Sequence, residues 1–371
     1  MGDSPLFSVV VVCCNVASYV GEALSSIAGQ TFADFECLVV TETSTDGTEQ
    51  AVAERIGKDP RFRVVNLPRS GSASVPRNYG IQHSRGTYLL YVDGDDWIDP
   101  DSLERFAAVF KEHPELDIVV SGSRNYRPRP DGSLELNGAY RQEVKPGAFE
   151  SGAALLEAAR FDRKWNPASY LNVYRRALLA DNRLFQPIGR LHQDSEWSYR
   201  VFLKAGPVMV VPFDFYNYRL HLSSVTHMSG SKTIYDQAEN VKSVCAFFAA
   251  GDYPERIRPM LANYFCHDFF HAPFLLRKYS GKLTTERLPR EDCRLALVEC
   301  IGTREQFRAY CRVVLAGRKS QWLFIPLMYL ARWRLFYPLC EWICRLWFEH
   351  LHSIYYAMKR KGFFGKSGRT A

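Results

Sequence analysis

The chain has 371 residues, enough for one large domain plus an extension, and carries a formal net charge of +7 at pH 7. The charge is uneven. From Arg318 onward ten Lys and Arg residues stand against two acids, whereas the rest of the chain carries 37 basic and 38 acidic residues. A nearly neutral body argues against nucleic acid as its substrate, because such substrates need a strongly basic surface.

The first hundred residues alternate between strand and helix patterns. Strands are expected at four segments rich in β-branched and aromatic residues: 7–12, 35–40, 62–66 and 88–92. Helices are expected at 18–30 and 48–56, and residues 70–80 form a loop that enters a short helix. This repeated unit predicts an α/β fold with a mostly parallel central sheet whose loops lie along one edge.

The strand at 88–92 ends in three carboxylates, Asp93, Asp95 and Asp96, with only a glycine between the first two. Carboxylates crowded in this way repel one another unless a positive charge lies nearby. Mn²⁺ or Mg²⁺ would supply that charge, typically bound through one or two carboxylates and substrate phosphates. An acidic turn that caps the helix starting near Pro100 is the alternative.

Two common nucleotide motifs are missing from this pattern. No Gly-x-Gly-x-x-Gly follows the first strand, and no Gly-x-x-x-x-Gly-Lys-[Ser/Thr] occurs in the sequence. A dinucleotide site or a P-loop is therefore not expected. A nucleotidyltransferase is disfavoured as well, since Cys13-Cys14-Asn15 stands where its glycine-rich phosphate loop would begin.

A series of short motifs resembles the family 2 glycosyltransferases of the GT-A fold. The motifs occur in the family's order: Asn15 after the first strand, Gln30-Thr-Phe32, Ser44-Thr-Asp-Gly47, Arg77-Asn78-x-Gly80, Asp93-Gly-Asp-Asp96, Gln193-Asp-Ser-Glu196 and Tyr218-Arg-Leu-His221. The resemblance extends to about residue 228. It implies an enzyme that moves a hexosyl or N-acetylhexosaminyl group, with inversion, from a nucleoside-diphosphate donor to an acceptor hydroxyl.

The resemblance also implies roles for particular residues. Mn²⁺ or Mg²⁺ would be held by Asp95 with Asp93, and His227 is a further candidate ligand. Asp96 is expected instead to accept hydrogen bonds from the loop beneath it. The donor-binding residues that the matched motifs imply are Asn15, Glu42, Arg77, Asn78, Asp93 and Arg219. A purely structural turn role for the two asparagines is the alternative, and for Arg77 the alternative to nucleotide binding is that it orients a loop carboxylate.

Asp194 is the expected general base. It opens an apolar-periodic stretch, and a helix N-terminus there would favour the charged carboxylate. An ordinary helix-capping aspartate is the alternative. Glu196 is the second-choice base, or it contacts the acceptor.

The nucleobase positions depart from the family pattern. Val12 and Cys14 replace a proline and an aromatic residue, and Thr41 with Glu42 replaces an aspartate pair. A uridine donor is therefore the default expectation, with a cytidine or deoxythymidine donor as alternatives. The same departures support a different class of function, a non-catalytic, membrane-bound scaffold or sugar-binding protein that keeps the fold.

Three segments are expected: a GT-A catalytic domain at 1–228, a helical module at 229–316 and a basic aromatic tail at 317–371. Within the first, residues 1–114 would bind the nucleotide-sugar and 115–228 the acceptor. The helical module would pack on the catalytic domain, contact the acceptor or mediate self-association.

The tail combines charge with aromatic residues. Its longest uncharged run, 320–331, is too short to span a bilayer, which takes about 20 apolar residues. Beyond Pro338, charged residues fall on one helical stripe, and Trp342, Ile343, Leu346 and Trp347 fall elsewhere. This pattern predicts a helix that lies on an anionic membrane surface, with a helix buried on its own domain as the alternative.

The ten cysteines show no Cys-x-x-Cys pair or zinc spacing, and no signal-like segment opens the chain. Free thiols in a reducing cytoplasm are expected. Together these observations predict a peripheral enzyme at the inner face of the cell membrane that builds or decorates a surface glycan or a lipid-linked acceptor.

Overall fold

The computed structural model describes residues 4–141, 144–159, 166–220, 231–250, 324–330 and 337–346, and the single positions 294, 295, 308, 311 and 335. The chain divides into two compact units. One comprises Met1–Ser224 with Phe247–Tyr253, and the other comprises Val225–Ala246 with Pro254–Ala371. The three-segment division expected from the sequence stays a prediction.

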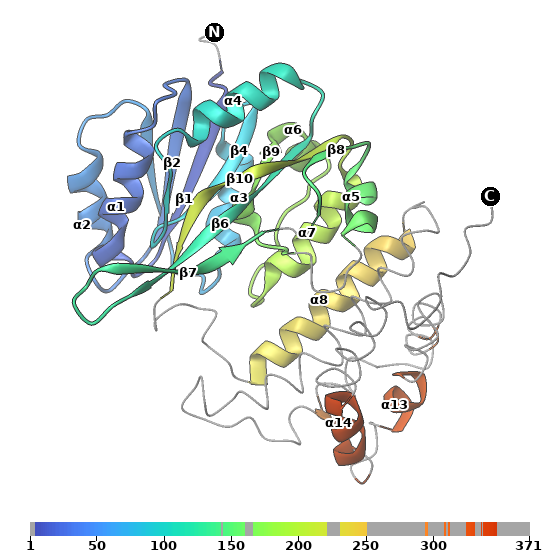
Figure 1. The fold of residues 1–371 in the computed structure, drawn as a ribbon. Helices are drawn as coiled ribbons and strands as arrows, with labels where there is room; N and C mark the ends of the chain where they lie inside the picture. Colours follow the sequence, from blue (N-terminus) through green and yellow to red (C-terminus); the bar gives the residue numbers. More distant parts are fainter. Residues whose placement is uncertain are drawn as a thin grey trace. The chain divides into compact units, whose positions relative to one another are not determined.

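The first hundred residues form the predicted alternation of strands and helices (Figure 1). In chain order the elements are β1 (Phe7–Cys13), α1 (Ala17–Ala28), β2 (Phe35–Glu42), α2 (Thr48–Ile56), β3 (Phe62–Leu67), α3 (Ser74–His83) and β4 (Tyr88–Asp93). The predicted strand and helix positions are confirmed to within a few residues, because β-branched runs and helical spacing dominate this part of the chain.

The second half of this unit adds shorter strands and helices. They are β5 (Trp97–Ile98), α4 (Ser102–Glu112), β6 (Ile118–Pro128), β7 (Leu134–Tyr140), β8 (Gly147–Phe149), α5 (Gly152–Ala158), a 3₁₀ turn η1 (Ser169–Leu171), β9 (Asn172–Arg175), α6 (Arg176–Asp181), α7 (Gln193–Lys204) and β10 (Val208–Arg219). The strands among these elements extend the sheet beyond β4.

The strands form one sheet in the order β3-β2-β1-β4-β9-β6-β10-β5, with β7 paired to β6 and β8 to β10. The first four are parallel neighbours, and β6 and β10 are parallel to each other. Because β9 is antiparallel to both β4 and β6, all six of these strands run the same way. Their carboxyl ends therefore meet at one edge, which is where open α/β sheets bind ligands.

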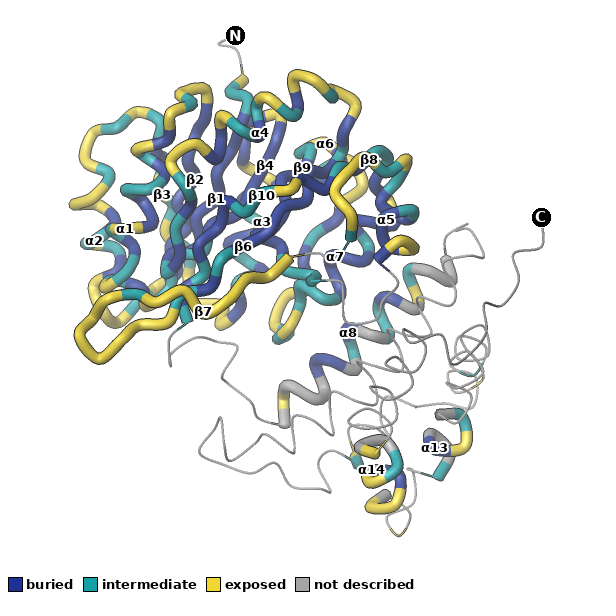
Figure 2. The backbone as a smooth tube through the Cα atoms, in the orientation of Figure 1, coloured by how far each residue is buried: buried dark blue, intermediate teal, exposed yellow. Residues whose placement is uncertain are grey.

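The core lies on both faces of the central strands (Figure 2). Every residue of β1 and β2 is buried, as expected for parallel strands covered by helices on both sides. Val9 and Val11 join a cluster with Leu24 of α1 and Phe106 of α4. Val10, which points to the other face, packs against α3.

Gly80 explains how closely α3 lies against the sheet. A Cβ atom placed there would lie 2.6 Å from Cγ1 and 2.7 Å from Cγ2 of Val10. Val10 is β-branched and fully buried, so it has little freedom to move aside. The glycine of the Arg77-Asn78-x-Gly80 motif thus allows the short distance between α3 and the sheet, and this distance in turn determines the position of the Arg77 side chain.

The other unit is described in part. Its helices are α8 (Ser231–Ala250, which continues into the first unit), α13 (Phe324–Leu330) and α14 (Tyr337–Leu346). The buried Cys340 of α14 contacts the carbonyl oxygen of Leu327 in α13 at 3.7 Å. Across the described residues, no helix combines the length and apolarity needed to cross a membrane.

We predict that Gly80→Ala lowers the free energy of unfolding, although alanine is intrinsically more favourable than glycine within a helix by about 1 kcal/mol. Overpacking against Val10 should cost about 1–3 kcal/mol and lower the thermal unfolding midpoint by several degrees. Val10→Ala should recover part of this loss in the double variant, because it removes the clashing methyl groups. Thermal unfolding of the two single variants and the double variant measures the coupling, and strictly additive losses would contradict direct contact.

Candidate active site

The end of β4 and the loop after it carry the acidic cluster, and Asp96 anchors this loop to β10. The Asp96 carboxylate accepts hydrogen bonds from the Tyr216 hydroxyl and the Arg219 backbone N–H, each at 2.7 Å. Burial raises the pKa of Asp96 well above its usual range, and the neighbouring Asp95 and Asp93 raise it further. Asp96 accepts hydrogen bonds as expected, but the donors come from β10 rather than from the loop beneath it.

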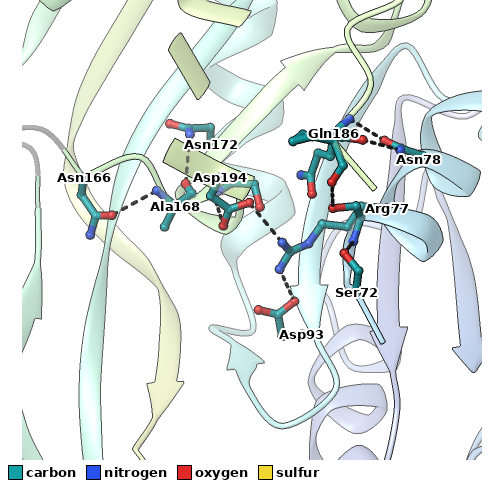
Figure 3. A network of polar contacts seen from close by, with 12 residues as sticks. Ser72, Arg77, Asn78, Asp93, Asn166, Ala168, Asn172, Gln186 and Asp194 are labelled. Atoms are coloured by element: carbon teal, nitrogen blue, oxygen red, sulfur yellow. Dashed lines mark hydrogen bonds and ion pairs between the residues drawn. The ribbon is translucent and has the colours of Figure 1, made fainter. Parts of the chain in front are cut away.

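Arg77 lies at the centre of the site and joins two carboxylates (Figure 3). One terminal nitrogen donates to Oδ1 of Asp93 at 2.7 Å, and the other donates to Oδ1 of Asp194 at 3.2 Å. The side chain is only 5% exposed. The sequence raised two roles for Arg77, nucleotide binding and orienting a loop carboxylate. The structure shows the second contact and extends it to Asp194; nucleotide binding stays a prediction.

Asp93 remains solvent-accessible on one side, with 23% of its side chain exposed. Burial raises the pKa of Asp93, and the nearby Asp95 adds to this effect, while Arg77 opposes it. The carboxylates of Asp93 and Asp194 share the one guanidinium of Arg77. Carboxylates crowded in this way repel one another, and a bound cation would offset that repulsion.

Asp194 lies in the first turn of α7, where the helix dipole favours a carboxylate. Besides Arg77 it contacts η1, since the Ser169 backbone N–H donates to its Oδ2 at 3.4 Å. Its side chain is 22% exposed. Thus both oxygens are oriented by the protein while part of the carboxylate still faces solvent, which suits a group that must meet a substrate.

Glu196 has a different environment although it is only two residues away. It is 1% exposed, and its two oxygens accept hydrogen bonds from Nε and a terminal nitrogen of Arg200, both at 2.7 Å. A buried, bidentate ion pair of this kind holds α7 together. The geometry therefore favours Asp194 over Glu196 as a base, and the reactive role of Glu196 stays a prediction without support from its contacts.

Three predicted donor-side residues organise the neighbouring loops. Asn15 has a positive φ of 53° and accepts a hydrogen bond from the Thr45 N–H at 2.9 Å. Glu42 is buried at the end of β2 and accepts from the Ser70 N–H at 3.2 Å. Asn78 exchanges two hydrogen bonds with the backbone of Gln186, at 2.7 and 2.8 Å (Figure 3). These contacts give each residue a positioning role, and donor contact stays a prediction for all three.

Arg219 reaches the acidic loop from the end of β10. Its Nε donates to the backbone oxygen of Asp95 at 3.0 Å, and a terminal nitrogen binds Glu22. Its guanidinium also lies over the rings of Trp97 and Tyr19, at 4.8 and 5.1 Å. This side chain thus holds the Asp95 backbone in place, and contact with a diphosphate stays a prediction.

The predicted metal ligands divide between described and undescribed residues. Asp93 is the last residue of β4 and Asp95 lies in the loop after it, whereas His227 lies outside the described residues. No group of three or more His, Cys, Asp or Glu side chains within the described ranges is arranged to hold a metal. Two carboxylates alone fit a hard cation whose remaining ligands are diphosphate oxygens and water.

Several residues of the site carry no signal in the sequence. Ser169 and Tyr170 of η1, Tyr216 of β10 and Gln186 lie around the acidic loop and Asp194 only because distant segments meet there. Tyr216 was the most accessible of these to prediction, since it precedes the matched Tyr218-Arg-Leu-His221 segment by two residues.

Comparison with known proteins agrees with this fold. The family model "Glycosyl transferase family 2" matches residues 8–165. EpsH of Bacillus subtilis (strain 168) is 26% identical over 265 residues, 71% of this chain and 74% of EpsH. EpsJ of the same organism is 31% identical over 229 residues, which are 60% of this chain and 64% of EpsJ. Both bear names that describe them as glycosyltransferases.

A solved structure, residues 1–349 of Staphylococcus aureus TarS in complex with UDP-GlcNAc, has the same fold. Its TM-score is 0.68 at 23% identity, with 88% of this chain and 87% of that chain covered. The ordered motifs, the sheet and these comparisons lead to one conclusion. Residues 8–165 match the family 2 glycosyltransferases and the fold is that of TarS, as the sequence predicted.

We predict that Asp96→Ala destabilises the protein, because it leaves the buried Tyr216 hydroxyl and Arg219 N–H without their acceptor. The expected loss is about 1–3 kcal/mol for each orphaned group, a fall of several degrees in the unfolding midpoint. Asp96→Asn keeps one acceptor oxygen and should lose clearly less. Thermal unfolding of both variants decides the matter, and equal losses would show that these hydrogen bonds contribute little.

Proposed function

We propose that this glycosyltransferase is an inverting enzyme that requires a divalent cation. In this proposal it transfers a hexose or N-acetylhexosamine from a nucleoside-diphosphate donor to an acceptor hydroxyl. The observation that carries the proposal is the sharing of Arg77 between Asp93 and Asp194. This contact brings the carboxylate expected beside the donor and the carboxylate expected to take the acceptor proton into one site.

In the proposal Asp95 and Asp93 hold Mn²⁺ or Mg²⁺. Bound there, the cation supplies positive charge that stabilises the departing diphosphate. Two observations support such a site: Asp93 and Asp194 share one guanidinium, and the nearby Asp95 raises the pKa of Asp93. Arg77 and Arg219 prepare it by fixing Asp93 and the Asp95 backbone before any ligand enters.

The transfer itself needs a base on the acceptor side. Asp194 accepts the proton of the acceptor hydroxyl while that oxygen forms a bond to the anomeric carbon of the donor sugar. The bond between this carbon and the diphosphate oxygen breaks in the same displacement, so the configuration inverts. Arg77 and the Ser169 N–H hold the Asp194 carboxylate in one orientation, which lowers the entropic cost of this step.

A uridine diphosphate donor is the first choice. Glu42 is buried at the end of β2, and Ser70 binds one of its oxygens. A carboxylate in this position can accept a hydrogen bond from an imino N–H of a base. TarS, whose structure contains UDP-GlcNAc, is named as a poly(ribitol-phosphate) β-N-acetylglucosaminyltransferase. By analogy we propose a surface glycan or lipid-linked polymer as the acceptor.

A test of the transfer site uses nucleotide release from UDP-GlcNAc, UDP-glucose, GDP-mannose and dTDP-glucose, with and without Mn²⁺. We expect Mn²⁺-dependent release from the uridine donors. Asp95→Ala should abolish the Mn²⁺ dependence. Once a donor and an acceptor are identified, Asp194→Asn should lower kcat for transfer by about 10²–10⁴-fold, the range for loss of a general base.

The alternative, a non-catalytic sugar-binding protein, gives a different pattern. It predicts Mn²⁺-dependent thermal stabilisation by a nucleotide-sugar without release of nucleotide. Glu196→Gln is the matched comparison for Asp194→Asn, since it also removes one charge from the first turn of α7. A larger loss of kcat in Glu196→Gln than in Asp194→Asn would show that Asp194 is not the base.

We further propose that the tail binds an anionic membrane surface. Three large apolar residues of α14, Leu339, Trp342 and Leu346, are 49%, 59% and 36% exposed, whereas Cys340 is buried. Their spacing places them along one side of the helix. The exposed stripe lies within the segment that carries ten Lys and Arg residues against two acids, as expected for an interfacial helix on an anionic leaflet.

We predict that the double variant Leu339→Glu/Trp342→Glu no longer pellets with liposomes that contain phosphatidylglycerol, because it adds charge to the apolar stripe. Leu136→Glu is the matched control, since Leu136 is an exposed apolar residue in the first unit. It should pellet like the unaltered protein. Removal of residues 318–371 should also abolish pelleting, and equal pelleting of the truncated protein would refute the membrane proposal.

A further inference from the structure

Four tyrosines form a ladder of rings across the acceptor half of the sheet. The Tyr170 ring is stacked on that of Tyr216, with centroids 4.4 Å apart, and is nearly parallel to that of Tyr218 at 5.9 Å. Tyr140 of β7 continues the series, with its centroid 6.2 Å from that of Tyr218. We call Tyr216, Tyr170, Tyr218 and Tyr140 the tyrosine ladder.

The strand register explains why three of these rings share a face. Ser123 of β6 pairs with Tyr216 on one side and with Tyr140 on the other. Asn125, two residues further along β6, pairs with Tyr218. Because directly paired residues point to the same face of a sheet, these three tyrosines lie on the face that carries Ser123 and Asn125. Tyr170 comes from η1 and covers this face.

The inner end of the ladder contacts the active site. The Tyr216 hydroxyl accepts a hydrogen bond from the Asp93 N–H at 3.0 Å and donates one to Asp96. Tyr170 follows directly on Ser169, whose N–H donates to Asp194. Burial raises the pKa of Tyr170, and the nearby Asp96, Tyr218, Asp93 and Tyr140 raise it further.

The outer end of the ladder is open to solvent. Tyr140 is 42% exposed and Tyr218 is partly exposed, whereas Tyr170 and Tyr216 are buried. Figure 2 shows β7 exposed along nearly its whole length. Gly138 pairs with Asn125, and a Cβ atom built on it would meet no atom of the described residues within 4 Å apart from its chain neighbours. The ring of Tyr140, with part of Tyr218, is therefore the part of the ladder that faces solvent.

We propose that Tyr218 and Tyr140 form a subsite for a pyranose ring of the acceptor, so that the acceptor is a glycan or glycoside rather than an alcohol without a ring. This inference rests on the proposed function, since it places the acceptor on the Asp194 side of the sheet. The C–H face of a pyranose carries partial positive charge and packs well on the negative face of an aromatic ring. Sugar hydroxyls at the ring edge can reach the phenol oxygens, which donate and accept hydrogen bonds.

Saturation-transfer NMR on the full chain tests the subsite without any knowledge of the donor. The probes are methyl β-D-glucopyranoside and methyl N-acetyl-β-D-glucosaminide, with sorbitol as a polyol that has no ring. We expect transfer to the ring C–H protons of at least one glycoside and little to sorbitol. Tyr140→Ala should lower the signal roughly fivefold, as expected for the loss of one ring contact, and Tyr140→Phe should retain most of it.

Leu136→Ala is the matched control, because it truncates an exposed apolar side chain on the same strand; its signal should equal that of the unaltered protein. Tyr218→Ala should also lose signal. If Tyr218→Ala does not fold, Tyr140→Ala decides alone, because Tyr140 lies at the surface and its loss should not disturb folding. An unchanged signal in Tyr140→Ala, equal transfer to sorbitol, or no transfer to either glycoside would overturn the subsite. Nucleotide release is measured separately, so a failure of the transfer reaction is distinguishable from a failure of this subsite.

Discussion

The buried charge of Arg77 is the constraint on which the site depends. A guanidinium that is 5% exposed must be paired, because an unpaired buried charge costs several kcal/mol. Its two partners, Asp93 and Asp194, come from the end of β4 and the start of α7, so the pairing fixes the distance between two segments more than a hundred residues apart. The acidic loop and helix α7 are thus positioned by one side chain.

The sheet brings this side chain to the right place. Six strands run in the same direction, and their carboxyl ends form one edge at which the loops after β1, β2 and β4 meet. Helix α3, which carries Arg77, lies close to β1 because Gly80 leaves room for Val10. Close helix–sheet packing and charge placement are therefore two results of the same short motif.

The second half of the chain supplies a different kind of support. Tyr216 and the Arg219 backbone donate hydrogen bonds to Asp96, and the Arg219 side chain donates one to the Asp95 backbone. With Asp96 used in this way, Asp93 and Asp95 are the carboxylates of the loop that can meet a ligand. The different roles within the acidic cluster follow from burial, since the most buried carboxylate, Asp96, is the one that accepts hydrogen bonds from β10.

The sequence by itself determined the α/β alternation, the family resemblance and the chemical types at the site, because β-branched runs, helical spacing and ordered motifs are local patterns. It also placed Asp194 at a helix start. Only the tertiary structure decided that Arg77 binds Asp93 and Asp194, that Glu196 is buried against Arg200, and that tyrosines from η1, β7 and β10 stack. These contacts join segments far apart in the chain, and which ones meet depends on strand order and register, which no local pattern contains.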